Sequence, residues 1–171
     1  MLETPRLILR PALIKDAENL YRLNSDPEVM RYTGDKKFNS PFEARNLIQE
    51  RIIPQYTQHR MGRFMAFLKD GTFIGWCGLK YFPETGEVDL GYRLIQHFWG
   101  MGYATEAGEC CIDYGFKELK LNRIIAKAMP ENIASIKVMQ KLGMTFRGYL
   151  RDPTDLQSFI VYDIFNSEKK P

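Results

Sequence analysis

A strand that passes through a glycine-containing loop into a helix is the segment that most constrains the fold of this chain. The apolar run at 90–95 predicts the strand, Gly100 and Gly102 lie in the loop, and small and apolar residues recur at helical spacing over 102–119. Glycines let the loop backbone approach an anion closely, and the first turn of the helix offers unpaired N–H donors at the positive end of its dipole. The segment therefore predicts a site for a phosphorylated ligand, with a turn that binds nothing as the alternative.

The rest of the hydrophobic pattern predicts a mixed α+β chain. Turn composition at 69–72 and 83–86 joins three consecutive strands into an antiparallel meander. Helical periodicity and strand alternation place the other elements before and after this meander. The expected strands are 7–9, 64–68, 73–81, 88–95, 123–128, 145–150 and 159–165, and the expected helices are 15–24, 41–59, 102–119 and 133–142.

Length and charge fit one globular domain that binds neither nucleic acid nor membrane. At 171 residues, of which 44% are hydrophobic, the chain can bury its own core, so we expect one domain over 1–166 and a flexible tail over 167–171. The 24 basic and 21 acidic residues are spread along the chain without the basic stripe that nucleic-acid binding requires. No segment approaches the roughly 20 apolar residues that span a bilayer, and the N-terminus lacks a secretory signal, so we expect a cytoplasmic protein.

The cysteines indicate a reducing environment. Cys77, Cys110 and Cys111 show neither paired metal-ligand spacing nor an even disulfide framework. All three lie in apolar segments. We therefore expect buried free thiols and no metal site.

A second helix begins with polar residues that complement the glycine loop. Asn132 and Ser135 lie at the start of the amphipathic helix 133–142, and Gly143 follows its end. Together the two segments resemble the GNAT N-acetyltransferases, whose coenzyme loop reads Arg/Gln-x-x-Gly-x-Gly/Ala and whose next helix carries Asn and ends Lys-x-Gly-Phe. Here the loop at 97–102 reads His-Phe-Trp-Gly-Met-Gly. The opening segment 4–11, Thr-Pro-Arg-Leu-Ile-Leu-Arg-Pro, is similar to the RimJ/RimL-like branch, which acetylates N-termini of ribosomal proteins.

The resemblance implies a mixed, mostly antiparallel sheet of about seven strands flanked by about four helices, with acetyl-coenzyme A inserted where the fourth and fifth strands splay apart. Backbone at Leu94 and Ile95 would pair with the pantetheine amides. Asn132 would hydrogen-bond the pantetheine arm, although a plain helix cap stays open as its role. The pyrophosphate would lie over the backbone N–H groups of Gly100, Met101, Gly102, Tyr103, Ala104 and Thr105, and no metal is implied.

Acetyl transfer by direct attack in a ternary complex requires a neutral amine, a place for its proton and a donor for the departing thiolate. Glu87 and Asp89 lie two apart on one strand, so both face one side and either could take the proton. Asp89 ranks first because relatives in this branch carry Glu at this position, and two solvated carboxylates are the alternative. Met139 stands where many family members have the tyrosine that protonates the thiolate, so the resemblance makes Ser135 the candidate donor.

The resemblance also implies an amine acceptor, in this branch the N-terminal amine of a ribosomal or other protein. An α-amine with a pKa near 7.8 is roughly 15% neutral at pH 7, whereas a lysine near 10.4 is about 0.04% neutral, so an N-terminal substrate asks less of a base. A polyamine, an aminoglycoside-like amine and an amino acid are alternative acceptors, and a non-catalytic acyl-coenzyme A binder is an alternative function. A homodimer is common among such enzymes. Loop residues that could line an acceptor pocket, rather than pack in the core, are Met30, Tyr32, Phe38 and Phe82.

Overall fold

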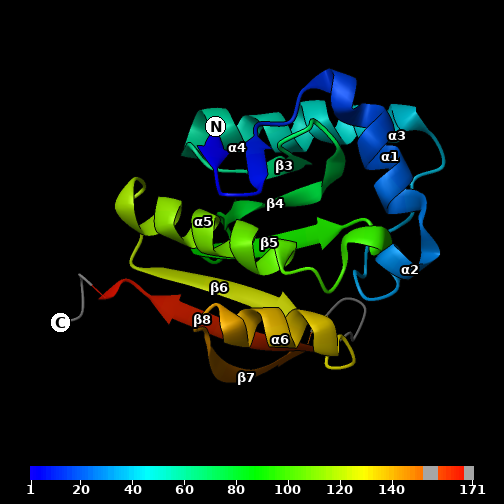
Figure 1. Ribbon diagram of the computed structural model, residues 1–171. Coiled ribbons are helices and arrows are strands. Elements are labelled where there is room, and N and C mark those ends of the chain that lie inside the picture. The colour runs from blue at the N-terminus through cyan, green and yellow to red at the C-terminus, as the bar shows by residue number, and fades with distance from the viewer. Residues whose placement is uncertain (152–157, 168–171) are drawn as a thin grey trace.

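An eight-stranded sheet organises the chain, in the order β1-β2-β3-β4-β5-β6-β8-β7 (Figure 1). The computed structural model describes residues 1–151 and 158–167. All of the expected strands are present, and β1 is an addition whose two residues are too few to show alternation in the sequence. The strands are β1 (Leu2–Glu3), β2 (Leu7–Arg10), β3 (Arg63–Leu68), β4 (Phe73–Phe82), β5 (Glu87–Leu94), β6 (Arg123–Ala128), β7 (Thr145–Arg151) and β8 (Ser158–Phe165).

The pairing of β5 with β6 differs from that of every other neighbouring pair in the described sheet. These two strands run parallel, whereas the other pairs are antiparallel. Their register holds a single residue pair, Asp89 with Ile125, after which the strands part toward their C-terminal ends (Figure 1). The expected splay between the fourth and fifth strands is therefore confirmed, and it falls between β5 and β6 because β1 shifts the numbering by one.

Helices cover both faces of the sheet. The expected helix over 41–59 is confirmed as one helical region, in which a π-helical stretch, Ile48–Ile52, joins α3 to α4. The sequence analysis does not predict the short α2. This helix begins at Pro27, and the Asp26 side chain stabilises it by accepting hydrogen bonds from the N–H groups of Glu28 and Val29. The helices are α1 (Ala17–Ser25), α2 (Pro27–Met30), α3 (Pro41–Leu47) and α4 (Ile53–His59) before β3, α5 (Tyr103–Lys117) between β5 and β6, and α6 (Ile133–Lys141) between β6 and β7.

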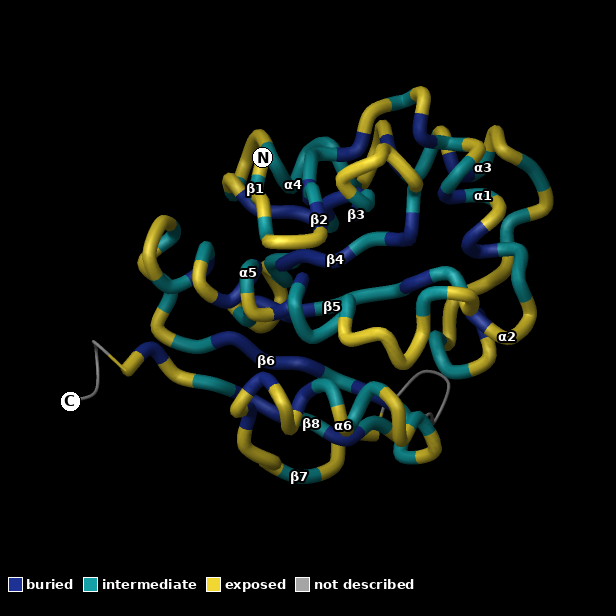
Figure 2. The backbone as a smooth tube through the Cα atoms, viewed as in Figure 1, coloured by how far each residue is buried: buried dark blue, intermediate teal, exposed yellow. Residues whose placement is uncertain are grey.

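Two apolar clusters join the helices to the sheet, one on each face, and the strands between them are largely buried (Figure 2). On β3, Met65 packs in the cluster with α1 and α3, whereas its neighbours Phe64 and Ala66 pack in the cluster with α5. The small residues of α5 allow close contact with the sheet, as expected. A Cβ on Gly115, for example, would lie 2.8 Å from Cδ1 of Ile124.

The three cysteines are free. Cys77 on β4 and Cys111 on α5 are buried, as expected, but Cys110 is only half-buried. The expectation of a buried thiol is wrong for Cys110 because successive residues of a helix point in directions about 100° apart, so this side chain lies at the margin of the core, beside Glu3 of β1, rather than in the centre.

In the described ranges, no helix combines the length and the apolar composition needed to cross a bilayer. Of the expected tail, 167–171, only Ser167 is among the described residues, and 168–171 lie outside them. The single domain over 1–166 stays a prediction.

Candidate functional site

A cavity of about 580 Å³ lies where β5 and β6 part. Both strands line it, together with the first turn of α5, the cavity-facing side of α6 and residues of α2 and the loop after it. Ile95 and Met101 do not line it, and the N–H of Ile95 already donates to the Ile74 carbonyl oxygen at 2.9 Å. The structure thus brings the glycine loop and the second helix to one cavity. The expected coenzyme-binding residues that line it are Leu94, Gly100, Gly102, Tyr103, Ala104, Thr105, Asn132 and Ser135.

Between β5 and α5 the chain turns on two glycines. Gly100 and Gly102 have φ angles of 75° and 84°, in the left-handed region that favours glycine. Nothing lies within 4 Å of a Cβ built on Gly100, so backbone conformation rather than lack of space requires glycine there. Gly102 is the N-cap of α5 and gives no side-chain cap to the N–H groups of the first turn. The helix therefore presents donors and the positive end of its dipole to an anion in the cavity.

The turn between β1 and β2 holds the glycine loop from outside the cavity. Arg6 donates to the Met101 carbonyl oxygen at 2.9 Å, pairs with Glu106 at 2.5 Å, and lies with its guanidinium carbon 4.3 Å from the centre of the Tyr103 ring. Thr4 also donates to Glu106. Burial raises the pKa of Glu106, but hydrogen bonds from Thr4 and Arg6 outweigh burial and hold that pKa below its ordinary value. Arg6 and Glu106 are 100 positions apart in the sequence, and sequence reasoning missed their pairing.

Asn132 and Ser135 lie at the start of α6, as expected. The Asn132 side-chain oxygen accepts a hydrogen bond from the Ser135 N–H at 3.1 Å, so Asn132 is the helix cap. The Ser135 hydroxyl oxygen lies 2.8 Å from the Tyr92 hydroxyl, which also donates to the Ser135 carbonyl oxygen. Met139, at the position of the family tyrosine, is fully buried in the core and does not line the cavity.

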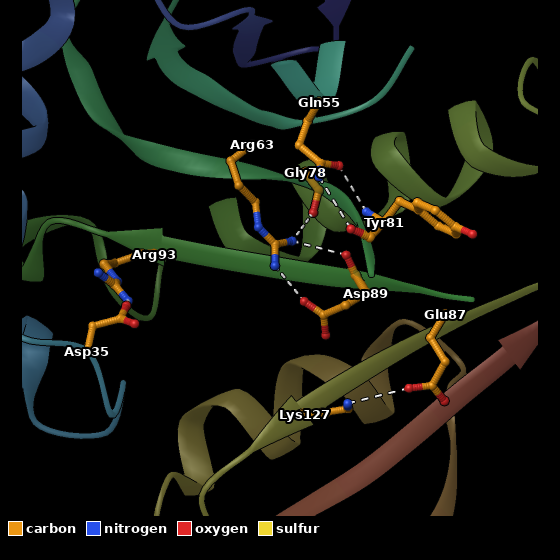
Figure 3. Close-up of polar contacts among 9 residues, drawn as sticks. All are labelled: Asp35, Gln55, Arg63, Gly78, Tyr81, Glu87, Asp89, Arg93 and Lys127. Carbon is orange, nitrogen blue, oxygen red and sulfur yellow. Dashed lines mark hydrogen bonds and ion pairs between the residues drawn. The ribbon is translucent and has the colours of Figure 1, made fainter. Parts of the chain in front are cut away.

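The two candidate carboxylates differ in their surroundings (Figure 3). Asp89 lines the cavity and pairs with Arg63, with 2.5 Å between the carboxylate oxygen and the guanidinium nitrogen. Arg63 also donates to the backbone oxygens of Gly78 and Asp89, and its side chain crosses β4 and ends over β5 at Gly91, which has no side chain. A Cβ on Gly91 would lie 2.6 Å from the Arg63 guanidinium carbon. Glu87 lies outside the cavity lining and pairs with β6, 3.5 Å from the Lys127 nitrogen.

On the face of the sheet that carries α1 and α3, the cavity is lined by Trp76 and by polar residues. The guanidinium carbons of Arg63 and Arg93 each lie 5.3 Å from the centre of the Trp76 ring system. Arg93 also pairs with Asp35 at 2.5 Å, which ties the loop after α2 to β5 (Figure 3). This face therefore combines an aromatic surface with carboxylates that are already paired.

Of the loop residues expected around an acceptor, Tyr32 lines the cavity and three do not. Met30 is buried, and Phe38 packs in the cluster with α1 and α3, so core packing explains both. Phe82 lies under the Lys80 ammonium group, 4.4 Å from ring centre to nitrogen. Within residues 1–151 and 158–167, no group of three or more His, Cys, Asp or Glu side chains could hold a metal ion.

Sequence reasoning missed the residues whose partners are distant in sequence. Arg63 and Asp89 are 26 positions apart, and Tyr92 and Ser135 are 43 apart. The signal available for Arg63 was a lone arginine at the start of an otherwise apolar strand. The signal available for Tyr92 is its position directly after Gly91, three residues from Asp89, which puts its side chain on the opposite face of the strand.

The chain matches a family of known proteins over most of its length. Residues 6–145 match the family described as an acetyltransferase (GNAT) domain. The uncharacterised N-acetyltransferase p20 of Bacillus licheniformis is 40% identical over 153 residues, which are 88% of this chain and 85% of p20. A solved structure of a GNAT-family acetyltransferase from Bacillus anthracis has a TM-score of 0.82 at 30% identity and covers 96% of this chain and 98% of that one.

Two solved structures with different acceptors share the fold at lower identity. RimL, a ribosomal L7/L12 alpha-N-protein acetyltransferase in complex with coenzyme A, has a TM-score of 0.82 at 18% identity, covering 95% of both chains. Spermidine N-acetyltransferase from Vibrio cholerae, in complex with coenzyme A and spermine, has a TM-score of 0.80 at 20% identity, covering 96% of this chain and 98% of that one. At these identities the likeness concerns the fold.

Proposed function

This chain belongs to the GNAT acetyltransferase family and is an acyltransferase, and we propose that it moves an acetyl group from acetyl-coenzyme A to the N-terminal amine of a protein or peptide. The observation that carries this proposal is a single cavity that both faces of the sheet share. The glycine loop and α6 line it from one face, and Asp89 and Trp76 line it from the other. Donor and acceptor can therefore approach each other through the gap between β5 and β6.

In this proposal the coenzyme lies along the gap as an additional strand, with its amides against the backbone at Leu94, since Ile95 lies outside the cavity lining and its N–H donates to Ile74. Its pyrophosphate lies over the N–H groups of 100–105, at the start of α5. Asn132 can serve as cap and ligand together. Its side-chain oxygen caps α6, and its amide N–H groups stay available to the pantetheine arm.

Ion pairing on the face that carries α1 and α3, where we propose that the acceptor binds, favours an N-terminal amine over a polyamine. Asp89 pairs with Arg63, and Asp35 pairs with Arg93. A polyamine carries several positive charges, and binding it tightly requires carboxylates that are not already neutralised. The opening segment 4–11, which is similar to the RimJ/RimL-like branch, also supports this acceptor.

Direct attack in a ternary complex assigns a role to each polar group of the site. The nitrogen–carbon bond forms as the carbon–sulfur bond breaks, and the electron pair of that bond goes to sulfur. Asp89 accepts the proton that the nitrogen loses, through water, and Ser135 donates a hydrogen bond to the sulfur. Glu87 is second to Asp89 because it pairs with Lys127 outside the cavity lining.

Two peptides that differ only in their amines test the acceptor. One has a free N-terminus and no lysine, and the other has an acetylated N-terminus and an internal lysine; spermidine is the third substrate. After calorimetric titration with acetyl-coenzyme A, thiol release is followed with each amine. We expect release with the free N-terminus at the highest kcat/KM. Release with spermidine alone, or with the lysine peptide alone, would overturn the proposed acceptor.

A further inference from the structure

The hydrogen bond between Tyr92 and Ser135 bridges the two halves of the sheet across the splay. Tyr92 projects from β5 and Ser135 from α6, and their hydroxyl oxygens lie 2.8 Å apart. The Tyr92 hydroxyl also donates to the Ser135 carbonyl oxygen at 3.0 Å. Both residues line the cavity, so this pair borders the space proposed for the thioester.

A serine on its own is a poor donor to a leaving thiolate, for two reasons. Its hydroxyl rotates freely, so the proton samples several directions. It is also a weak acid, so catalysis depends on how well it is oriented. Met139 is buried in the core, so no tyrosine on α6 assists Ser135 at the usual family position. Tyr92 instead brings a phenol to the Ser135 hydroxyl from β5.

We propose that Tyr92 is a positioning residue for thiolate departure, which directs the Ser135 hydroxyl at the sulfur atom. As charge develops on sulfur, the Tyr92 proton turns from the Ser135 carbonyl oxygen to the Ser135 hydroxyl oxygen, and the Ser135 proton turns to sulfur. Neither residue gives up its proton in this step. The proton lost by the amine goes to Asp89 through water, and the sulfur leaves as a thiolate that the Ser135 hydrogen bond stabilises. The thiolate then takes a proton from solvent and Asp89 returns its own to solvent, so the protons balance.

The surroundings of Tyr92 suit a group that only donates. Burial raises the pKa of Tyr92 above its ordinary value near 10, and the hydrogen bond with Ser135 opposes this only in part. The phenol therefore keeps its proton throughout the pH range in which an N-terminal amine is acetylated. This inference rests on the proposed function, because it needs a thiolate to leave.

The test is a double-mutant cycle of Tyr92→Phe and Ser135→Ala, read as kcat and as the Kd for acetyl-coenzyme A. Each single variant should lower kcat about tenfold, the size of one lost hydrogen bond, and keep Kd within about twofold. The double variant should be no slower than Ser135→Ala, because Tyr92 acts through Ser135. Thermal melting checks that each variant is folded.

Tyr114→Phe is the matched control. The Tyr114 hydroxyl donates to the Arg60 carbonyl oxygen at 2.6 Å from α5 and lies outside the cavity lining, so its removal should leave kcat and Kd unchanged. Multiplying losses in the double variant, an unchanged kcat in Tyr92→Phe, or a weakened Kd at full kcat would each overturn the inference. If only spermidine is acetylated, the proposed acceptor fails, and the cycle run with spermidine still decides the role of Tyr92. If the wild-type protein acetylates no amine, both proposals fall.

Discussion

Asp89 and Tyr92 lie three residues apart on β5 and project from opposite faces of the sheet, yet both line the same cavity. Asp89 lies on the face with Arg63 and Trp76, whereas Tyr92 reaches Ser135 on α6 at the other face. An acyl group between β5 and β6 would have the proposed proton acceptor on one side and the proposed contact to sulfur on the other. The amine can then approach from one face while the thiolate leaves toward the other, as direct attack requires.

A negative charge at the start of α5 should prevent coenzyme binding. In Gly102→Glu the new side chain meets Arg6 at a left-handed position and places a carboxylate where the pyrophosphate is proposed to bind. We expect calorimetry to show acetyl-coenzyme A binding weakened at least about a hundredfold, since each tenfold loss needs only 1.4 kcal/mol. Gly71→Glu introduces the same charge at another left-handed glycine, in the turn between β3 and β4, and should bind normally. Normal binding by Gly102→Glu would show that the loop assignment is wrong.

The two carboxylates of β5 should separate clearly in kinetics. Asp89→Asn removes the proposed proton acceptor from the cavity and should lower kcat about a hundredfold while acetyl-coenzyme A still binds. Glu87→Gln, the matched change on the same face of the strand, loses only its ion pairs with β6 and should stay near wild-type kcat. Because Asp89→Asn leaves Arg63 without its ion-pair partner, circular dichroism should accompany the assay. Equal losses in the two variants would remove the distinction between these residues.

Arg6 should matter for coenzyme affinity although it contacts the glycine loop from outside. Arg6→Ala removes the hydrogen bond to Met101 and the contact with Tyr103, so the glycine loop becomes more mobile in the free protein. Coenzyme binding must then order the loop, and the free energy of that ordering weakens the affinity. We expect Kd for acetyl-coenzyme A to rise about tenfold, with kcat at saturation retained. Lys69→Ala removes the ion pair with Glu3 at the same end of the sheet, 3.1 Å long, and is the matched control. A Kd equal to that of the control would mean that Arg6 only stabilises the fold.

The elements and the coenzyme half of the site could be predicted from the sequence because their signals are local. Strand alternation, turn composition at 69–72 and 83–86, and the glycines before α5 all depend on residues a few positions apart. Ala44, Ile48 and Ile52 keep a four-residue spacing into the π-helical stretch Ile48–Ile52, so the sequence predicts 41–59 as one helix. The short α2 and β1 contain too few residues to form a periodic pattern.

The polar pairs of the site could not be predicted, because only the folded sheet brings their members together. Arg63 reaches Asp89 across β4 because Gly91 leaves room for its guanidinium group, and no spacing rule identifies such a pair. The same holds for Tyr92 and Ser135, which meet only once α6 packs beside the splay. The family resemblance identified Ser135 but not its partner.

Stability should depend on Glu106 in a defined pH window. Hydrogen bonds from Thr4 and Arg6 hold the pKa of Glu106 below its unfolded value of about 4.3, so its stabilisation is complete above that pH and is lost as pH falls through the lower, folded pKa. Glu106→Gln should therefore lower the free energy of unfolding by about 1–3 kcal/mol at pH 7, and this difference should shrink below about pH 4. Urea unfolding at pH 7 and at pH 3.5 measures both values.

Glu109→Gln, at an exposed position of the same helix, is the matched control and should change the free energy of unfolding by less than about 0.5 kcal/mol at either pH. A Glu106→Gln difference that is the same at both pH values would show that the charge of Glu106 does not stabilise the contact between the β1–β2 turn and the start of α5.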